Sequence, residues 1–327
     1  MRFYTGTYTR MGGPGISVCH LDYGQITQVC TIRDLNDPTY VILSRDGQIL
    51  YAVGSDDDGN GMVASYRAEH DCLSPISRQY TGGRAACHLT LSPDERFLYV
   101  ANYLSGSVSV FPVNENVLGK RIQIAEHKGT GIHPIRQEAA HTHQCIFRPG
   151  TNELFVCDLG IDQIVIYEQD PETGMLTPKG KIPMPSGMGP RHLVFANADH
   201  FYVTGELDNY VRHCFCKNSS WMIVGEISTL PTEYLGESLS AAIRLYEGTL
   251  YVSNRGHDSL CEIQLDRFGN MTDAAWSSTG GQYPRDFAMF HQGAIFAHQN
   301  GGGITTDTGA FLPMDGAVCI CIDYTTE

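Results

Sequence analysis

The stretch GPRHLVFANADHFYVTGELDNYVRHCF, residues 189–215, contains two strand-like segments on either side of a short turn. Residues 201–204, FYVT, have the aromatic and β-branched content of a buried strand, and apolar residues also precede the turn. Strands joined by a tight turn run antiparallel, so the start of the first and the end of the second lie at the same edge of the sheet. Arg191 opens the first strand and Glu206 closes the second. The sequence therefore predicts that this guanidinium and this carboxylate, fifteen positions apart, are neighbours.

The same unit recurs along the chain. An aromatic residue in the second strand marks each of seven copies, at positions 4, 51, 99, 155, 202, 251 and 296. The markers step by 47, 48, 56, 47, 49 and 45 residues, and a loop with a further alternating strand follows each. A period of roughly 40 to 50 residues with about four short strands is typical of a β-propeller blade. We therefore expect an all-β fold in which residues 1–327 form a single seven-bladed β-propeller domain, with mostly four antiparallel strands per blade.

The two ends of the chain leave the closure of the ring open. Residues 1–33 supply only three strands, and the innermost strand of their blade is missing from the N-terminal sequence. The C-terminal segment GAVCICIDYTTE, residues 316–327, resembles a third strand of the last blade. We therefore expect one or two blades with three strands.

Composition disfavours several classes of function. The net charge of −14 argues against nucleic-acid binding, and no stretch reaches the length of a membrane span, so no membrane association is expected. The N-terminal sequence MRFYTGTYT begins with a strand and has no apolar h-region, which favours a cytoplasmic chain. The eleven cysteines are odd in number and lack a C-x-x-C pair, as is typical of buried reduced thiols. Neither the charge nor the cysteines indicate an oligomeric state.

Two segments resemble metal sites. Residues 56–61, DDDGNG, begin like a calcium loop, but the twelfth position is Arg67, where a bidentate Glu is needed. His141 and His143 are spaced to share one face, with Glu138 near, but no third ligand follows at a strong spacing. We therefore expect neither a metal nor another cofactor. For His143 an acid–base or substrate-binding role is preferred, with hydrogen bonding within the fold as the alternative.

Equivalent positions in successive repeats place four polar residues at one mouth of the central channel. His143 and Arg191 lie four residues before the last apolar position of successive inner strands, and Glu206 and Arg255 lie four residues after successive aromatic markers. Two arginines, a glutamate and a histidine that converge on a funnel indicate a binding or catalytic site, so these four are the candidate catalytic residues. Further polar residues near strand ends are candidate substrate contacts, with a turn or capping role as the alternative. They are His141, Arg285, Asn102 and Asp158.

At these residues the chain resembles the lactonase family of seven-bladed β-propellers, which includes bacterial 6-phosphogluconolactonases and fungal carboxy-muconate cyclising enzymes. The resemblance extends from TGTYT near the start to AHQ near Gln299, and it rests on HTHQCIFRPG, GPRHLVF, SNRGHDSL, YPRDF and SPDERFLYVANYLSGSVSVF. It implies that the active site consists of His143, Arg191, Arg255 and Glu206. After Gln299 the chain departs from the family, since GGGITTDTGAFLPMDG replaces a short loop.

The residues and the resemblance favour opening of a sugar lactone by water, in particular of 6-phosphogluconolactone. Glu206 or His143 would act as base, and Arg191 and Arg255 would polarise the carbonyl or bind a carboxylate or phosphate of an anionic small-molecule substrate. No G-x-S-x-G nucleophile elbow is present, so direct attack by water is expected. Two alternatives remain open: ring closure by addition of a carboxylate to a double bond, and a non-catalytic propeller that binds a protein or glycan.

Overall fold

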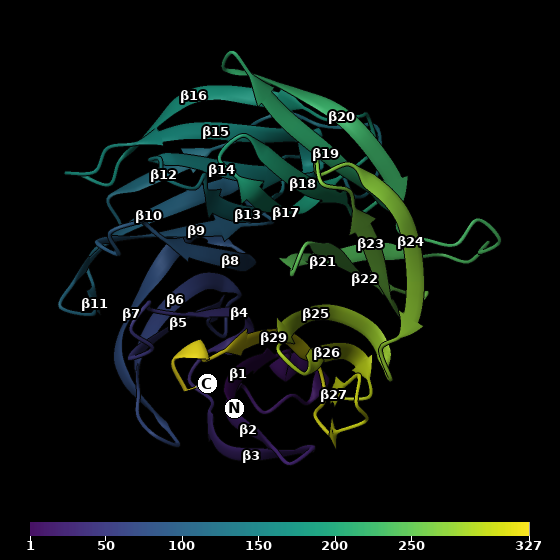
Figure 1. The fold of residues 1–327 in the computed structure, drawn as a ribbon. Coiled ribbons are helices and arrows are strands. Elements are labelled where there is room, and N and C mark those ends of the chain that lie inside the picture. The colour runs from purple at the N-terminus through teal and green to yellow at the C-terminus, as the bar shows by residue number, and fades with distance from the viewer. Residues whose placement is uncertain (327) are drawn as a thin grey trace.

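Seven antiparallel β-sheets surround a common centre in the computed structural model, which describes residues 1–326 (Figure 1). Each sheet is one blade, and its strands follow one another outward from the innermost, which lies at the central axis. Three short 3-10 helices, η1 (Thr9–Met11), η2 (Leu159–Ile161) and η3 (Tyr324–Thr326), complete the regular structure of this part of the chain. The seven-bladed β-propeller expected from the repeat is confirmed.

The first four blades contain the following strands, in order from the centre outward. Blade 1 contains β29 (Ala317–Ile322), β1 (Arg2–Thr7), β2 (Ile16–Asp22) and β3 (Gln25–Ile32). Blade 2 contains β4 (Asn36–Leu43), β5 (Ile49–Ser55), β6 (Asn60–Ala68) and β7 (Leu73–Arg84). Blade 3 contains β8 (Ala86–Leu91), β9 (Phe97–Asn102) and β10 (Ser107–Asn114), and β10 pairs with both β11 (Val117–Leu118) and β12 (Gln123–Glu126). Blade 4 contains β13 (Thr142–Phe147), β14 (Glu153–Asp158), β15 (Gln163–Gln169) and β16 (Leu176–Pro183).

The remaining three blades follow the same order. Blade 5 contains β17 (Pro190–Asn197), β18 (His200–Gly205), β19 (Tyr210–Lys217) and β20 (Ser220–Ser228). Blade 6 contains β21 (Leu239–Tyr246), β22 (Thr249–Arg255), β23 (Ser259–Leu265) and β24 (Met271–Ser278). Blade 7 contains β25 (Gln282–Phe290), β26 (Gly293–Gly301), β27 (Ile304–Thr306) and β28 (Phe311–Leu312).

The ring closes through the C-terminal strand, and the expectation of three-stranded blades is wrong. β29 pairs antiparallel with β1, with Phe3 opposite Ile322, and so provides the missing innermost strand of blade 1. Figure 1 shows the two chain ends close together at this blade. The segment after Gln299 forms the two short outer strands of blade 7 and thereby frees the following strand to cross into blade 1. Every blade therefore has at least four strands.

The hydrophobic core is divided among the junctions between neighbouring blades. In β5, Leu50 and Ala52 pack with blade 1, whereas Tyr51 and Val53 pack with blade 3. Successive side chains of a strand point to opposite faces, so a strand buried between two blades is apolar at every position. This explains why the second strand of each repeat reads as a continuous apolar run and is the clearest repeat marker in the sequence.

We expect that replacing Arg2 by methionine weakens the ring closure. Arg2 donates hydrogen bonds from Nε and Nη2 to Oδ2 of Asp323, at 3.0 and 2.5 Å, and the Asp323 side chain is fully buried. Removal of one partner of a buried ion pair costs about 3 kcal/mol or more in the free energy of unfolding, which urea titration measures.

The pH dependence of this loss tests its electrostatic origin. Burial tends to raise the pKa of Asp323, but hydrogen bonds from Thr325 and Arg2 lower it below its ordinary value of 3.8. A lowered carboxyl pKa gives stability that is present above 3.8 and lost as the pH falls through the folded-state pKa. The stability difference between wild type and Arg2→Met should therefore shrink below this pH. A difference that does not change with pH would show that Arg2 acts through packing alone.

Candidate active site

A cavity of about 600 Å³ opens at the centre of the ring. Its wall includes three of the four candidate catalytic residues, His143, Glu206 and Arg255, and also Arg285. Arg191 lines a smaller cavity that shares His143 and Arg285 with the first, so it lies at the inner end of the same site. The structure thus brings together the residues that the register of three successive blades predicted to converge.

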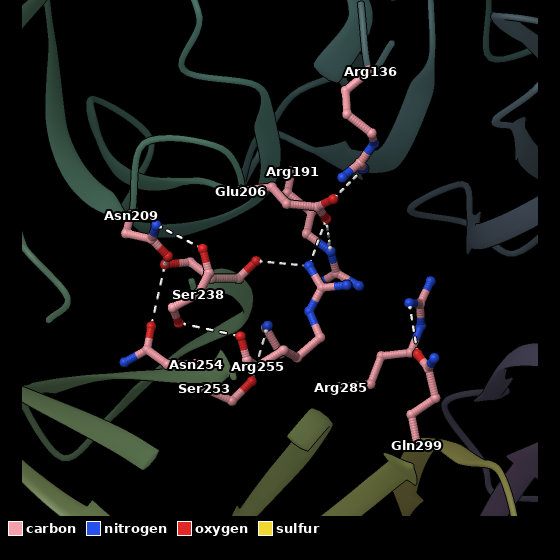
Figure 2. A network of polar contacts seen from close by, with 12 residues as sticks. Arg136, Arg191, Glu206, Asn209, Ser238, Ser253, Asn254, Arg255, Arg285 and Gln299 are labelled. Carbon is pink, nitrogen blue, oxygen red and sulfur yellow. Dashed lines mark hydrogen bonds and ion pairs between the residues drawn. The ribbon is translucent and has the colours of Figure 1, made fainter. Parts of the chain in front are cut away.

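Glu206 is the centre of a buried ionic cluster (Figure 2). Its Oε2 lies 2.7 Å from Nη2 of Arg255 and 2.9 Å from Nε of Arg191, while its Oε1 accepts a hydrogen bond from Nη2 of Arg136. The Glu206, Arg191 and Arg255 side chains are at most 4% exposed. The prediction that Arg191 and Glu206 are neighbours is therefore confirmed, because the β17–β18 hairpin places the start of one strand beside the end of the other.

The cluster makes Glu206 a weak base. Burial alone would raise the pKa of Glu206, but Arg255, Arg191 and Arg136 outweigh it and hold the pKa well below its ordinary value. Burial and the neighbouring Arg255 lower the pKa of Arg191 to about 9. A carboxylate whose charge is stabilised by three guanidinium groups has little tendency to take up a proton near neutral pH. Its two oxygens contact three guanidinium groups and so link the three arginines in one cluster.

His143 differs from Glu206 in its charge and in its hydrogen-bond partners. Burial, followed by the charge of Arg191, lowers the pKa of His143 well below 6.5, so the ring is neutral near pH 7. Its Nδ1 is buried and has no hydrogen-bond partner among the described residues. The ring packs edge-on against Tyr103 and His192, with centroid distances of 5.8 and 5.1 Å. A neutral, oriented imidazole on the cavity wall is able to accept a proton from a bound water.

Arg285, a predicted substrate contact, lies on the cavity wall, whereas the other three do not. His141 lies behind that wall: its ring stacks on Tyr103 at 4.5 Å, and its Nδ1 contacts the Tyr103 carbonyl oxygen at 3.0 Å. It therefore orients a cavity residue but does not itself face the cavity.

Asn102 and Asp158 are fully buried in the protein, and the expectation that they contact substrate does not fit their positions. The Asn102 amide donates to Oγ of Ser109, and Asp158 accepts the backbone N–H of His141 at 2.7 Å and contacts His127 Nδ1 at 2.7 Å. These contacts fix the loops at the ends of β9 and β14. A turn or capping role, the alternative to substrate contact, explains both residues.

Arg136 is a site residue that the sequence did not reveal. It comes from the long connection between β12 and β13, and its guanidinium also donates to the Tyr103 hydroxyl at 3.3 Å. His133 Nδ1 accepts the Arg136 backbone N–H at 3.1 Å and shapes this loop. The only sequence signal is the enlarged spacing of 56 residues between two aromatic markers, which indicates extra residues at this edge but does not indicate which of them turns inward.

The cavity offers neither a metal site nor an activated thiol within residues 1–326. No group of three or more His, Cys, Asp or Glu side chains is arranged there to hold a metal ion. Burial raises the pKa of Cys87, on the cavity wall, to about 12, so this side chain is a neutral thiol near pH 7. In the same part of the chain, no helix has the length and apolar character needed to span a bilayer.

The chain can be assigned to a known protein family by comparison. The family model described as "Lactonase, 7-bladed beta-propeller" matches residues 2–306, and the chain belongs to this family. It is 34% identical over 297 residues to a 6-phosphogluconolactonase of Bacillus subtilis, a match that covers 88% of this chain and 84% of the relative.

Solved structures agree with this assignment. A periplasmic gluconolactonase of Pseudomonas aeruginosa superposes with a TM-score of 0.90 at 26% identity, covering 98% of each chain. A putative 6-phosphogluconolactonase of Bacteroides fragilis superposes with a TM-score of 0.87 at 25% identity, covering 98% of this chain and 96% of the other. The resemblance seen in the sequence motifs is therefore confirmed at the level of the family.

Proposed function

We propose that the protein hydrolyses a sugar lactone, with 6-phosphogluconolactone as the substrate, and that His143 is the general base. The observation that carries the proposal is the contrast within one cavity between a neutral imidazole and a carboxylate already held by three arginines. Family membership and the Bacillus subtilis relative support the reaction class. A phosphorylated sugar substrate is consistent with a cytoplasmic enzyme of carbohydrate metabolism, although the Pseudomonas relative is described as periplasmic.

The reaction consumes one water and needs no other reactant. His143 takes a proton from the water as its oxygen attacks the lactone carbonyl carbon. Arg255, on the cavity wall, donates hydrogen bonds to the carbonyl oxygen as it gains negative charge. The ring C–O bond then breaks, and the imidazolium returns its proton to the departing ring oxygen. The product is the hydroxy acid, whose carboxyl group ionises in solution.

Arg191 and Glu206 act from behind this reacting centre. Arg191 contacts Glu206 at the inner end of the site, and Glu206 in turn fixes the guanidinium of Arg255. In the proposed mechanism Glu206 orients the oxyanion donor and stabilises its charge, and Arg191 holds Glu206 in place. Arg136 and Tyr103 close the same cluster from the rim, and His141 supports Tyr103 from behind.

The pure protein should open 6-phosphogluconolactone faster than the spontaneous reaction, as followed by NMR of the ring-opened acid. The absence of any rate above the spontaneous one would reject the phosphosugar assignment. Conversion of a carboxy-muconate to its lactone by the same protein, without lactone opening, would instead support the cyclising alternative.

The pH dependence of kcat/KM should reflect the low pKa of His143. A base must be unprotonated to act, so activity is lost only as the pH falls through its pKa, which lies well below 6.5. We therefore expect kcat/KM to stay level from about pH 7.5 to about pH 5.5 after subtraction of the spontaneous rate. A decline with a midpoint near 6.5 would show that the functional base is an unshifted histidine.

A further inference from the structure

The cavity wall carries an excess of positive charge. Five arginines line the cavity, against two carboxylates, although the chain as a whole has a net charge of −14. The arginines are Arg10, Arg84, Arg136, Arg255 and Arg285, and the carboxylates are Asp37 and Glu206. Such a local reversal of sign concentrates anions from solution in the cavity.

The two carboxylates do not neutralise this charge evenly. Arg136 and Arg255 share Glu206, and Arg10 pairs with Asp37. Among the described residues, no carboxylate oxygen lies within 4.0 Å of a guanidinium nitrogen of Arg84 or Arg285. The hydrogen bond that the Arg285 guanidinium forms is to the neutral amide oxygen of Gln299, at 3.1 Å. Two cationic groups on the cavity wall therefore have no carboxylate at ion-pair distance among the described residues.

These two arginines belong to other blades than the Glu206 cluster. Arg285 is on β25 of blade 7, and Arg84 ends β7 of blade 2, where the chain passes into blade 3. The Glu206 cluster comes from blade 5, from blade 6 and from the loop that leads into blade 4. Blade 7 follows blade 6 in the ring, so Arg285 lies beside this cluster and lines the smaller cavity together with Arg191. Figure 2 shows Arg285 and Gln299 set apart from the arginines that hold Glu206.

Blade 1 supports this side of the cavity. The Tyr8 ring, on the loop after β1, lies between Arg10 and Arg285, whose guanidinium carbons are 3.8 and 5.5 Å from its centroid. A guanidinium held over an aromatic face keeps its N–H groups free in its own plane. Arg285 is thus oriented and charged before any ligand arrives.

We propose that Arg285, assisted by Arg84, binds the phosphate of a phosphorylated sugar lactone while the lactone ring lies against His143 and Arg255. This inference rests on the proposed function and assigns the anion-binding role to residues other than Arg191 and Arg255, which the sequence favoured. Planar guanidinium groups bind phosphate oxygens through paired, charge-assisted hydrogen bonds. A lactone without a phosphate would leave Arg285 and Arg84 without a counter-charge and would gain nothing from this side of the cavity.

The test compares phosphorylated and unphosphorylated lactones in steady-state assays. For Arg285→Gln we expect KM for 6-phosphogluconolactone to rise about ten- to a hundred-fold, because a charge-assisted contact is lost. KM for gluconolactone should rise by a much smaller factor, since that substrate does not use the contact. Arg84→Gln should show the same pattern with a smaller rise. Arg267→Gln is the matched control, since Arg267 is exposed on the β23–β24 turn and remote from the cavity wall.

Equal effects on both lactones, or no effect on either, would overturn the proposal. A binding measurement keeps this test separate from the proposed activity: calorimetry compares 6-phosphogluconate with gluconate on wild type and Arg285→Gln. We expect the phosphorylated acid to bind wild type more tightly and the variant to lose this preference. Wild-type protein that opens neither lactone would reject the proposed function, whereas an Arg285→Gln variant that retains the preference would reject the phosphate site.

Discussion

Replacement of His143 by glutamine is expected to lower kcat for lactone opening by about 10²–10⁴-fold, the usual contribution of a positioned general base. KM should change little, because the ring contributes a proton acceptor and not a charged substrate contact. Glutamine has a similar length and remains polar, so the packing of the cavity wall between Tyr103 and His192 is largely retained. Initial rates at pH 7 with 6-phosphogluconolactone, corrected for the spontaneous reaction, measure the effect.

Two further histidine variants identify which imidazole acts. His200 lies at the other end of β18 from Glu206, so the variant His200→Gln should leave kcat unchanged. His141→Gln should lower kcat by about ten-fold or less, through disorder of Tyr103, since His141 stacks on that ring without facing the cavity. A loss for His141→Gln as large as that for His143→Gln would contradict the assignment of the base.

The fold was predictable from the sequence because the repeat is strong at the strands that are buried on both faces. Its closure was not predictable, because the pairing of Phe3 with Ile322 spans the whole chain and has no local pattern. The outer strands β27 and β28 have only three and two residues, which is too short for alternation to be recognised. The C-terminal strand therefore read as a continuation of blade 7, although it is the innermost strand of blade 1.

The site was predictable to the extent that its residues lie on strand ends. His143, Arg191, Glu206 and Arg255 follow from register, since equivalent positions of successive blades converge on one axis. Arg136, on an irregular loop, and Arg10, in the short 3-10 helix η1, have no strand register that would place them. Asn102 and Asp158 also lie at strand ends, but their side chains are buried against hydrogen-bond partners in other segments, Ser109 and His127, which the linear sequence does not indicate.

The sequence also does not decide which residue acts as the base. Glu206 and His143 are equal candidates in the sequence, because both are titratable and both lie at the mouth of the channel. Three arginines around Glu206, and burial beside Arg191 around His143, shift both pKa values downward, so both groups are weaker bases than in water. They differ in availability: both Glu206 oxygens are held by guanidinium groups, whereas Nδ1 of His143 has no hydrogen-bond partner among the described residues.

Replacement of Glu206 by glutamine is expected to impair both stability and catalysis. The variant leaves three guanidinium groups converging on a site without negative charge, so the free energy of unfolding should fall by about 3–5 kcal/mol. Repulsion should also move Arg255 away from the carbonyl oxygen and lower kcat by about 10²–10³-fold, the usual cost of losing an oxyanion donor. Urea unfolding and steady-state kinetics on the same preparation measure the two effects.

The coupling of these two losses distinguishes an organising carboxylate from a general base. A base would lose kcat with little change in stability, whereas the ionic cluster requires both to fall. Because the pKa of Glu206 is held well below 4.5, its contribution to stability is complete above that pH and is lost only as the pH falls through the lowered value. The difference in unfolding free energy between wild type and Glu206→Gln should therefore be constant from about pH 5 to about pH 8. Asp37→Asn removes the other carboxylate of the cavity and with it the ion pair to the exposed Arg10, while the amide oxygen can still accept from the Arg10 backbone N–H and the Thr9 hydroxyl. This variant should cost about 1 kcal/mol or less and leave kcat within about ten-fold.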